Sequence, residues 1–301
     1  MTDLKDLSAQ SLFNVKGWVA VVTGGGTGLG LITAKALAAN GVKVYITGRR
    51  VEKLKDAEMQ DSSSGGSITG LQMDVTDKDS IKAGVTEISG KEKCVNLLIN
   101  NAGVTSVNYG EKGMPEGSVA EVSEAMFASQ GFEEWTSINK ATPRLLLTMT
   151  RVNVASYYFT SVAFLPLLTA ARDHGYSEAG SILNISSISG ITKASQNGQF
   201  SYNASKAGTI SLTEQLAVDF KRPDIEVRVN TLAPGYFPSE MTPIDKEDGN
   251  EKKHFREKWG IPFGRAGNPR DYAAAILNFA VNQYVTGSTL TIDGGWLLAS
   301  V

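Results

Sequence analysis

Thr23-Gly24-Gly25-Gly26-Thr27-Gly28-Leu29-Gly30 stands between an apolar run and a helical pattern. The apolar run, Val19 to Thr23, predicts a central strand that is covered on both faces. The helical pattern begins at Ile32 and stops at Gly41. A glycine-rich turn in this position lets backbone N–H groups approach a pyrophosphate at the positive end of the helix dipole. The stretch therefore predicts a dinucleotide site. A purely structural turn is the alternative, because the glycine spacing differs from Gly-x-Gly-x-x-Gly.

The rest of the chain repeats this alternation of short β-rich runs and longer helical patterns, which is typical of βαβ units around a parallel sheet. Helical patterns include Asp79 to Ile88 and Ser205 to Phe220. The strands predicted after the first are Val42 to Thr47, Ile68 to Met73, Val95 to Ile99, Ser181 to Ile185, Glu226 to Asn230 and Ser288 to Ile292. The sequence thus predicts an α/β fold, a Rossmann-type doubly wound sheet of seven parallel strands. It forms a single domain, 16–301, after an N-terminal extension, 1–15.

The composition argues against several other kinds of protein. The chain has 301 residues, 42% of them hydrophobic, and a formal net charge of −2. It can bury a large core and offers no basic field for nucleic acid. The single cysteine, Cys94, allows no intrachain disulfide. The N-terminus has no apolar stretch long enough for a signal peptide or a membrane span. We expect a cytoplasmic protein that binds neither nucleic acid nor membrane.

Tyr202-Asn203-Ala204-Ser205-Lys206 carries the second informative pattern. Tyr202 and Lys206 are four residues apart, so on a helix they share one face. A phenol with a pKa near 10 is a poor acid or base at neutral pH, but a nearby ammonium favours the phenolate. We expect Lys206 to lower the pKa of Tyr202, which could then exchange a proton with a carbonyl or alcohol oxygen. The two histidines, His174 and His254, lack metal-ligand spacing, so no metal site is predicted.

These motifs resemble the ordered motif set of the classical short-chain dehydrogenase/reductase family. Asn100-Asn101-Ala102-Gly103, Ser187 and Pro234-Gly235 complete the set, and the resemblance extends from about Lys16 to Leu298. It implies the same seven-stranded sheet, a nicotinamide cofactor and a Ser-Tyr-Lys centre. Ala233 to Thr242 and Asp293 to Trp296 are similar to the 3-oxoacyl reductases of the rhamnolipid type and to fungal relatives.

The resemblance implies four catalytic residues, Ser187, Tyr202, Lys206 and Asn153. Ser187 would hydrogen-bond the substrate oxygen, although Ser189 has the spacing from Tyr202 that the family shows, 13 residues against 15 for Ser187. Extra residues in the loop that contains Gln196-Asn197-Gly198 would account for the difference. The alternative is that Ser187 only caps the end of the strand. Asn153 would hold a water beside the lysine, or its side chain could simply bond the backbone or solvent.

Thr47-Gly48-Arg49-Arg50 ends the second strand with two cations and no carboxylate. A carboxylate there would accept from the ribose hydroxyls of NAD, whereas a cation favours the extra phosphate of NADP. NADP(H) is therefore predicted, and a solvated strand edge is the alternative. By resemblance, Asp74 meets the adenine and Ser239 lies near the carboxamide. The predicted cofactor site comprises Gly24, Thr27, Gly28, Leu29, Gly30, Arg49, Arg50, Asp74, Val75, Asn101, Ala102, Gly103, Tyr202, Lys206, Pro234, Gly235, Phe237 and Ser239.

Two further segments stand out against the family pattern. Trp135 is farther from Asn153 than the resemblance implies, which predicts an insertion at 139–150. Pro143 predicts that the chain is broken or rerouted near residues 140–144. The apolar residues that follow are expected to pack at the sheet edge, against a neighbouring subunit or over the substrate cleft. The segment 236–262 resembles the substrate lid of the family.

The predicted function is NADP-dependent transfer of a hydride between nicotinamide and a carbonyl or alcohol of a small to medium apolar substrate, a ketone or a 3-oxoacyl compound. Two alternatives remain. One is a tailoring enzyme of secondary metabolism that reduces an imine or assists a cyclisation. The other is a catalytically silent protein that senses the cofactor. A homodimer or homotetramer is expected, built on the helices that begin near Val152 and Ser205.

Overall fold

A parallel sheet of seven strands forms the centre of the computed structural model, as predicted. The structure describes residues 4–60, 63–105, 115–129, 149–176, 178–239, 242 and 252–299. The strand order is β3-β2-β1-β4-β5-β6-β7, and every neighbouring pair is parallel. The strands are β1 Val19–Thr23, β2 Lys43–Gly48, β3 Ser67–Gln72, β4 Leu97–Asn100, β5 Ser181–Ile185, β6 Arg228–Pro234 and β7 Thr289–Ile292.

The largest difference from the predicted strands concerns β6, which was expected to begin at Glu226. The backbone of Glu226 has a φ of 55°, a left-handed conformation that cannot continue a strand. The strand begins two residues later and extends through Pro234, because it pairs with β5 as far as Leu232 and with β7 as far as Ile292. This extension brings Gly235 to the carboxyl edge of the sheet, where ligands bind in open α/β folds.

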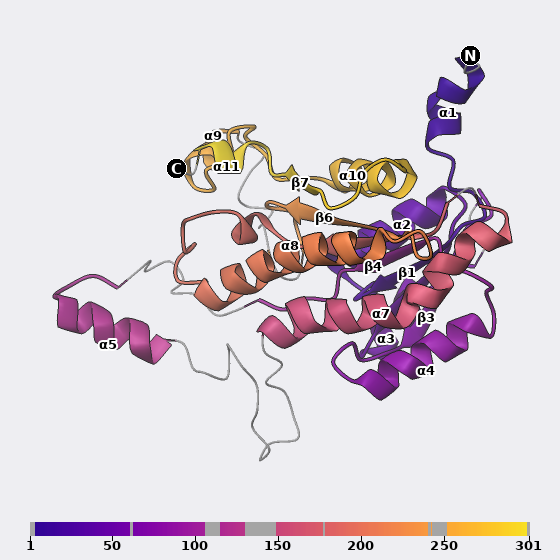
Figure 1. Ribbon diagram of the computed structural model, residues 1–301. Helices are drawn as coiled ribbons and strands as arrows, with labels where there is room; N and C mark the ends of the chain where they lie inside the picture. The colour runs from indigo at the N-terminus through magenta and orange to yellow at the C-terminus, as the bar shows by residue number, and fades with distance from the viewer. Residues whose placement is uncertain are drawn as a thin grey trace.

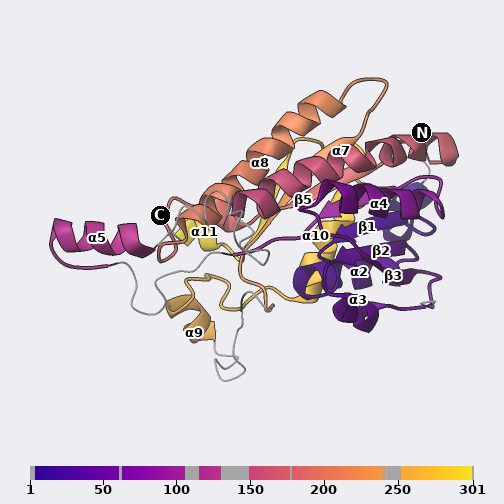
Figure 2. The same ribbon diagram turned by 90° about the horizontal axis from the view of Figure 1, so that it is seen from below.

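Helices cover both faces of the sheet (Figures 1 and 2). On one face α2, α3 and α10 pack over a core that includes Leu37, Ile46 and Phe279. On the other face α4, α7 and α8 pack over a core that includes Leu98, Phe164 and Phe220. The described helices are α1 Ala9–Leu12, α2 Gly28–Ala39, α3 Val51–Ala57, α4 Lys78–Ser89, α5 Val119–Ser129, α7 Ser156–Thr169, α8 Phe200–Phe220, α9 Lys252–Glu257, α10 Pro269–Val281 and α11 Trp296–Ala299.

A buried polar network fixes α8 to the middle of the sheet. Asn100 Nδ2 donates to Asn184 Oδ1 over 2.9 Å, and Asn184 Nδ2 donates to Thr213 Oγ1 over 2.9 Å. Thr231 Oγ1 donates to Thr213 Oγ1 over 2.7 Å. These residues come from β4, β5, β6 and α8 and are fully buried. Because each bond exists at only one relative position of helix and strands, the network sets where the residues of α8 meet the sheet.

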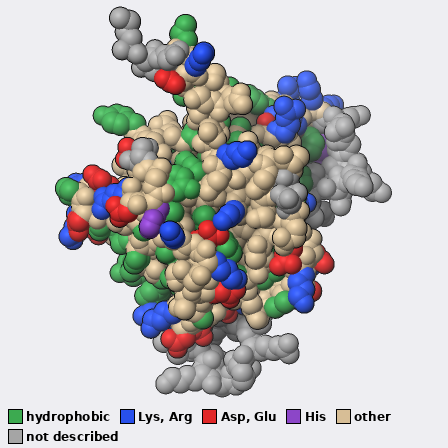
Figure 3. All heavy atoms as spheres, turned by 90° about the vertical axis from the view of Figure 1, so that its right-hand side faces the viewer, with side chains coloured by type: hydrophobic (Ala, Val, Ile, Leu, Met, Phe, Trp, Pro, Cys, Tyr) green, Lys and Arg blue, Asp and Glu red, His purple; other side chains and the backbone are tan. Residues whose placement is uncertain are grey.

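The outer surface combines mixed charge with apolar stretches. In Figure 3, Lys and Arg side chains are interspersed with Asp and Glu, so that face has no patch of a single sign. The stretch Arg151–His174, which contains α7, is long and apolar enough to cross a membrane by length and composition, and 39% of its most apolar window is buried. A core helix passes the same test, and α7 packs on the sheet. In Figure 1, α5 extends away from the sheet.

Parts of two predicted segments lie outside the described residues. Of the insertion at 139–150, only Met149 and Thr150 are described, and both are helical. The predicted break near residues 140–144 and the placement of the apolar residues after it therefore stay predictions. Of the predicted lid at 236–262, the structure describes 236–239, 242 and 252–262, which include α9 and the buried side chains of Phe255 and Ile261.

Candidate active site

The glycine-rich turn joins β1 to α2 at the carboxyl edge of the sheet. Gly24 and Gly28 have φ values of +65° and +53°, which glycine adopts without strain. A Cβ on Gly24 would lie 2.9 Å from Ala102 Cα, and a Cβ on Gly30 would collide with the carbonyl oxygen of Gly24. The turn therefore packs closely on Ala102 and on its own backbone, and its glycines present bare backbone to the neighbouring cleft. Thr27 makes no side-chain cap bond, so the first N–H groups of α2 are left for a ligand.

Asn101 and Thr23 fasten the ends of β4 and β1 together beneath this turn. Asn101 Nδ2 donates to Thr23 O over 3.0 Å and to Gly24 O over 3.2 Å. Thr23 Oγ1 in turn accepts from the backbone N–H groups of Asn101 and Ala102, at 3.0 and 3.1 Å. The Asn101 side chain is thus spent on holding the glycine turn in shape. Asn101 was predicted to belong to the cofactor site, and it does line the wall of the cleft beside the turn.

A cleft of about 330 Å³ opens beside the turn and reaches Tyr202 and Lys206. Of the predicted cofactor residues, the cleft is lined by Gly24, Thr27, Gly28, Leu29, Gly30, Arg49, Arg50, Asp74, Val75, Asn101, Ala102, Gly103, Tyr202, Lys206 and Ser239. Pro234, Gly235 and Phe237 do not line it. Phe237 was expected beside the nicotinamide but is only 4% exposed, and its ring packs on Tyr272 with 5.5 Å between ring centres. Its side chain therefore belongs to the core.

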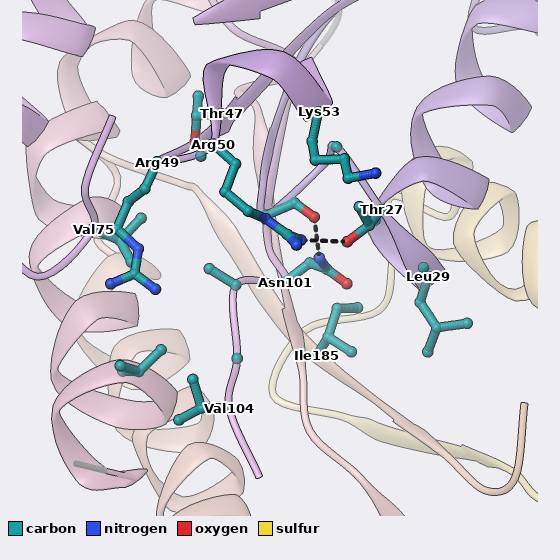
Figure 4. A pocket seen from close by; sticks show the side chains of 18 of the residues that line it. Thr27, Leu29, Thr47, Arg49, Arg50, Lys53, Val75, Asn101, Val104 and Ile185 are labelled. Carbon is teal, nitrogen blue, oxygen red and sulfur yellow. Dashed lines mark hydrogen bonds between the residues drawn. The ribbon is translucent and has the colours of Figure 1, made fainter. Parts of the chain in front are cut away.

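Three cations line the cleft, two on one side and one on the other (Figure 4). Arg50 and Lys53 extend toward Thr27, and Arg50 donates to Thr27 Oγ1 over 3.3 Å. The Arg49 guanidinium lies on the other side, beside Val75. Among the described residues that line the cleft, Asp74 is the sole carboxylate, and its Oδ1 accepts from the backbone N–H and the hydroxyl of Thr76 at 2.9 and 2.7 Å.

Several residues of the cleft were not predicted from the sequence. Lys53 follows Arg50 by three positions, the spacing that puts two side chains on one side of a helix, and this was a usable signal. The Thr47 hydroxyl is buried and has no hydrogen-bond partner among the described residues. The lining residues that were not predicted are Gly26, Thr47, Gly48, Lys53, Leu54, Met73, Thr76, Val104, Val152, Ile185 and Ser186.

Ser187 lies two residues after the end of β5 and faces the phenol of Tyr202. Its hydroxyl hydrogen-bonds the Tyr202 side chain and lies 3.1 Å from Ser189 Oγ. It also accepts from the backbone N–H of Ser189 over 3.1 Å and so caps the short helical turn Ile188–Gly190. Ser187 can therefore cap this helical turn and contact Tyr202 at the same time. Ser189, the alternative by spacing, is 5% exposed. Gln196, Asn197 and Gly198 all have positive φ, consistent with extra residues in this loop.

Tyr202 and Lys206 lie on one side of α8, as predicted, but their electrostatic relation differs from the expectation. Burial raises the pKa of Tyr202, and the hydrogen bond from Ser187 lowers it by less. Burial also lowers the pKa of Lys206 to about 7. The ammonium donates to Ile185 O over 2.9 Å and lies 5.8 Å from the centre of the Tyr202 ring. The expected lowering of the Tyr202 pKa by Lys206 is therefore wrong for this state, because desolvation outweighs the charge of a partly neutral lysine.

Asn153 lies in a π-helical turn, Arg151–Ala155, immediately before α7. Its Oδ1 accepts from Val104 N over 3.0 Å, and its Nδ2 donates to Val104 O over 3.0 Å and to Ser205 Oγ over 2.9 Å. Both amide protons are thus used inside the protein. The side chain connects the chain after β4 to α8, next to Lys206. A water relay at Asn153 stays a prediction. A water could donate to the second lone pair of Oδ1 or to the backbone carbonyl, which also accepts from Thr209 Oγ1 over 2.7 Å.

The cleft fits an anionic dinucleotide. It combines a glycine turn without side chains, the start of a twelve-residue helix that Thr27 does not cap through its side chain, and three cations. The orphaned Thr47 hydroxyl adds a buried polar group to the wall. The described residues contain no group of three His, Cys, Asp or Glu side chains that could hold a metal ion.

Known proteins that resemble this chain include short-chain dehydrogenases and reductases. Residues 18–250 match the model of a family described as short chain dehydrogenase. The chain is 35% identical over 294 residues to the short-chain dehydrogenase/reductase PhomF of Diaporthe leptostromiformis, covering 97% of this chain and 95% of that protein. It is 30% identical over 279 residues to the 3-oxoacyl-[acyl-carrier-protein] reductase FabG of Chlamydia pneumoniae, covering 91% and 95%. The structure of the Pseudomonas aeruginosa RhlG/NADP active-site complex superposes with a TM-score of 0.70 at 25% identity, covering 95% and 98%.

Proposed function

The chain belongs to the short-chain dehydrogenase/reductase family of oxidoreductases, and from that premise we propose that it is an NADP-dependent carbonyl reductase or alcohol dehydrogenase. Its substrate is a ketone or 3-oxoacyl compound of small to medium size and largely apolar character. The observation that carries this proposal is that Tyr202 and Lys206 line the dinucleotide cleft, with Ser187 hydrogen-bonded to the Tyr202 phenol. That arrangement offers a proton donor and an oxygen-binding hydroxyl where a nicotinamide ring would end.

The side chains divide the chemistry between them. A bound nicotinamide supplies the hydride, which in the reductive direction is transferred to the carbonyl carbon of the substrate. The Ser187 hydroxyl donates a hydrogen bond to the carbonyl oxygen and holds it against Tyr202. Tyr202, whose raised pKa keeps the phenol protonated at neutral pH, gives its proton to that oxygen in the reductive direction. Lys206 replenishes the proton and hydrogen-bonds the cofactor, and Asn153 holds Lys206 and its surroundings in place.

The preference for NADP rests on the cations at the end of β2 and the start of α3. Arg49, Arg50 and Lys53 line the cleft, and no carboxylate lies at the described end of β2. A guanidinium binds a phosphate with two parallel hydrogen bonds, whereas the ribose hydroxyls of NAD favour a carboxylate. The superposition on the RhlG complex, which contains NADP, supports this assignment.

The apolar character of the substrate rests on what surrounds Ser187. Ile188, the next residue, packs in a buried cluster with Phe255, Ile261 and Trp296, against which Tyr236 and Trp259 lie. This wall excludes water from the reacting carbonyl and strengthens the hydrogen bonds made to it. A small apolar oxo compound fits such a wall, and the relationship to a 3-oxoacyl reductase supports the same class.

One assay separates this proposal from its alternatives. NADPH oxidation is measured against a panel of ketones, imines and 3-oxoacyl thioesters, and each active substrate is repeated with NADH. Turnover of ketones or thioesters with NADPH supports the proposal, and turnover of imines alone supports a tailoring enzyme. NADPH binding without turnover of any compound supports a silent sensor. A preference for NADH would overturn the assignment of the cofactor.

We further propose a cytoplasmic homodimer or homotetramer that uses the outer face of α7 and α8. This face exposes Tyr158, Phe159, Val162 and Val218, at 44, 37, 42 and 57%. Apolar side chains grouped on two neighbouring helices are typical of a subunit interface.

A further inference from the structure

The loop between Ser187 and Tyr202 has an unusual backbone. Gln196, Asn197 and Gly198 are three consecutive residues with left-handed φ values of 51°, 62° and 88°. Asparagine and glycine adopt this conformation readily, but glutamine rarely does. Such strain persists where the surrounding contacts over-determine it, and it clusters at ligand-binding sites.

The conformation directs the Gln196 amide into the protein rather than into water. The amide hydrogen-bonds the phenol of Tyr236, which follows the Pro234-Gly235 turn at the end of β6. The other polar atom of the amide, Oε1, is buried and has no hydrogen-bond partner among the described residues. Turning the amide over would exchange the two atoms and again leave one of them unpaired. A buried amide that is half satisfied is costly unless a ligand completes it.

The surroundings of this amide are aromatic and adjoin the catalytic serine. The Tyr236 ring contacts Trp259 and Trp296 edge-on, with ring centres 5.1 and 6.0 Å apart. The Trp259 Nε1–H is also buried without a partner among the described residues, so the cluster holds both an unused acceptor and an unused donor. Ile188, next to Ser187, packs in the same cluster. The polar atoms therefore lie in the wall that was assigned above to the substrate.

We propose that Gln196, held by Tyr236, determines specificity by hydrogen-bonding a hydroxyl group of the substrate that is remote from the reacting carbonyl. The substrate class is a ring-bearing ketone with a phenolic or alcoholic hydroxyl. The ring packs on the aromatic wall, and the hydroxyl donates to Gln196 Oε1 while its oxygen can accept from Trp259. This inference rests on the proposed carbonyl reductase function and narrows its substrate class. A plain acyl chain would leave the amide unpaired.

The test compares ketones that differ only in one hydroxyl. We would measure kcat and KM with NADPH for 1-tetralone and its 5-, 6- and 7-hydroxy derivatives, in the wild type and in Gln196→Leu. Leucine has a similar branched shape, is one atom shorter than glutamine and removes both polar atoms. Asn197→Gly is the matched control, because it alters the next residue of the same left-handed turn, whose side chain is exposed. Equilibrium dialysis of the same compounds against NADP-loaded protein gives affinities without turnover.

The wild type should prefer at least one hydroxylated isomer over 1-tetralone by about tenfold or more in kcat/KM, mainly through KM. Gln196→Leu should bring the ratio of kcat/KM for that isomer to kcat/KM for 1-tetralone down to about one, while Asn197→Gly keeps the ratio of the wild type. Equal losses for all ketones, or a preference that survives Gln196→Leu, would overturn the proposal. So would a wild type that neither turns over nor binds any hydroxylated isomer better. If no carbonyl compound is reduced, the proposed function fails, and the dialysis comparison still decides on Gln196.

Discussion

At the scale of single residues, the site depends on how burial shifts the proton affinities of two side chains in opposite directions. Tyr202 holds its proton more tightly than a free phenol, and Lys206 holds its own less tightly than a free amine. In the reductive direction this pairing suits a tyrosine acid that is fully protonated at neutral pH and a lysine that can give up a proton to restore it.

Tyr202→Phe tests the role of the acid. The substitution keeps the ring and removes the proton donor, so kcat should fall by about 10² to 10⁴ fold while cofactor affinity stays nearly unchanged. Steady-state kinetics with NADPH and cofactor binding by calorimetry provide the two measurements. Near-normal turnover in this variant would show that another group protonates the carbonyl oxygen.

Lys206→Met tests the low pKa of the lysine through stability. The folded pKa is about 7, below the usual value near 10.4 in the unfolded chain. Between these values the unfolded state binds more protons, so the contribution of Lys206 to stability is present above the unfolded pKa and is lost as pH falls through the folded one. The free energy of unfolding of the wild type, measured relative to Lys206→Met, should rise between pH 7 and 9.5. Over the whole range between the folded and unfolded pKa values, the total rise is on the order of 4 kcal/mol. Urea unfolding of the cofactor-free proteins across this range measures the difference. A difference that does not change with pH would mean that the lysine keeps its ordinary pKa.

Arg49→Ala tests the cofactor preference. Losing a charge-assisted contact to phosphate costs about 1.5–3 kcal/mol, so the KM for NADPH should rise about ten- to a hundredfold. The KM for NADH should hardly move, because NADH has no phosphate at that position. Kinetics with both cofactors measure the ratio. Parallel losses for the two would indicate that Arg49 supports the fold of the strand end instead.

Part of this residue-level chemistry follows from the sequence and part does not. Spacing alone puts Tyr202 and Lys206 on one helical face, and residue type alone identifies Arg49 and Arg50 as possible phosphate ligands. The direction of the Tyr202 pKa shift could not be predicted, since it depends on burial by residues distant in the chain. The buried position of Phe237 against Tyr272 was missed for the same reason.

At the scale of elements, the π-helical turn Arg151–Ala155 places Asn153 between the end of β4 and α8. Single-turn π segments are frequent at functional sites, because they redirect one residue without ending the helix. The sequence identified Asn153 by resemblance and predicted the strands and helices of the sheet to within a few residues. The hydrogen bonds of Asn153 to Val104 and Ser205 connect residues that are separated by 49 and 52 positions in the chain, respectively. No local sequence pattern encodes such contacts.

Asn153→Leu tests these hydrogen bonds. Leucine has a similar size but leaves the N–H and carbonyl of Val104 and the Ser205 hydroxyl without this partner in a buried place. The free energy of unfolding should fall by about 3 kcal/mol or more, and kcat should fall as Lys206 loses its support. Ser156→Ala is the control, because it removes a buried hydroxyl that bonds only within the same helical segment, to Val152 O at 2.6 Å. Urea unfolding and kinetics compare the two variants. Equal, small losses would show that Asn153 is no more than an ordinary buried amide.

At the scale of the whole molecule, the described parts of α7 and α8 expose several apolar side chains on the outside of their helical layer. Tyr158 and Val162 are four residues apart on α7, and Val218 lies on α8. The parallel sheet could be predicted because its strands are nearly continuous apolar runs. The resemblance led us to expect assembly through these two helices. Which of their side chains face outward could not be predicted, because a helix that is apolar all round gives no periodicity to distinguish its covered side from its exposed side.

Val162→Glu tests whether this face joins subunits. A stable interface buries about 800 Å² on each partner and tolerates a buried unpaired carboxylate poorly. The substitution should therefore lower the assembly by at least one step, from tetramer to dimer or from dimer to monomer, at a protein concentration where the wild type is fully assembled. Val51→Glu is the matched control: Val51 is 37% exposed against 42% for Val162, and it lies on α3, on the opposite face of the sheet. Sedimentation velocity measures the mass of each variant. The face would be excluded as an interface if Val162→Glu kept the mass of the wild type, or if the wild type itself were a monomer at micromolar concentration.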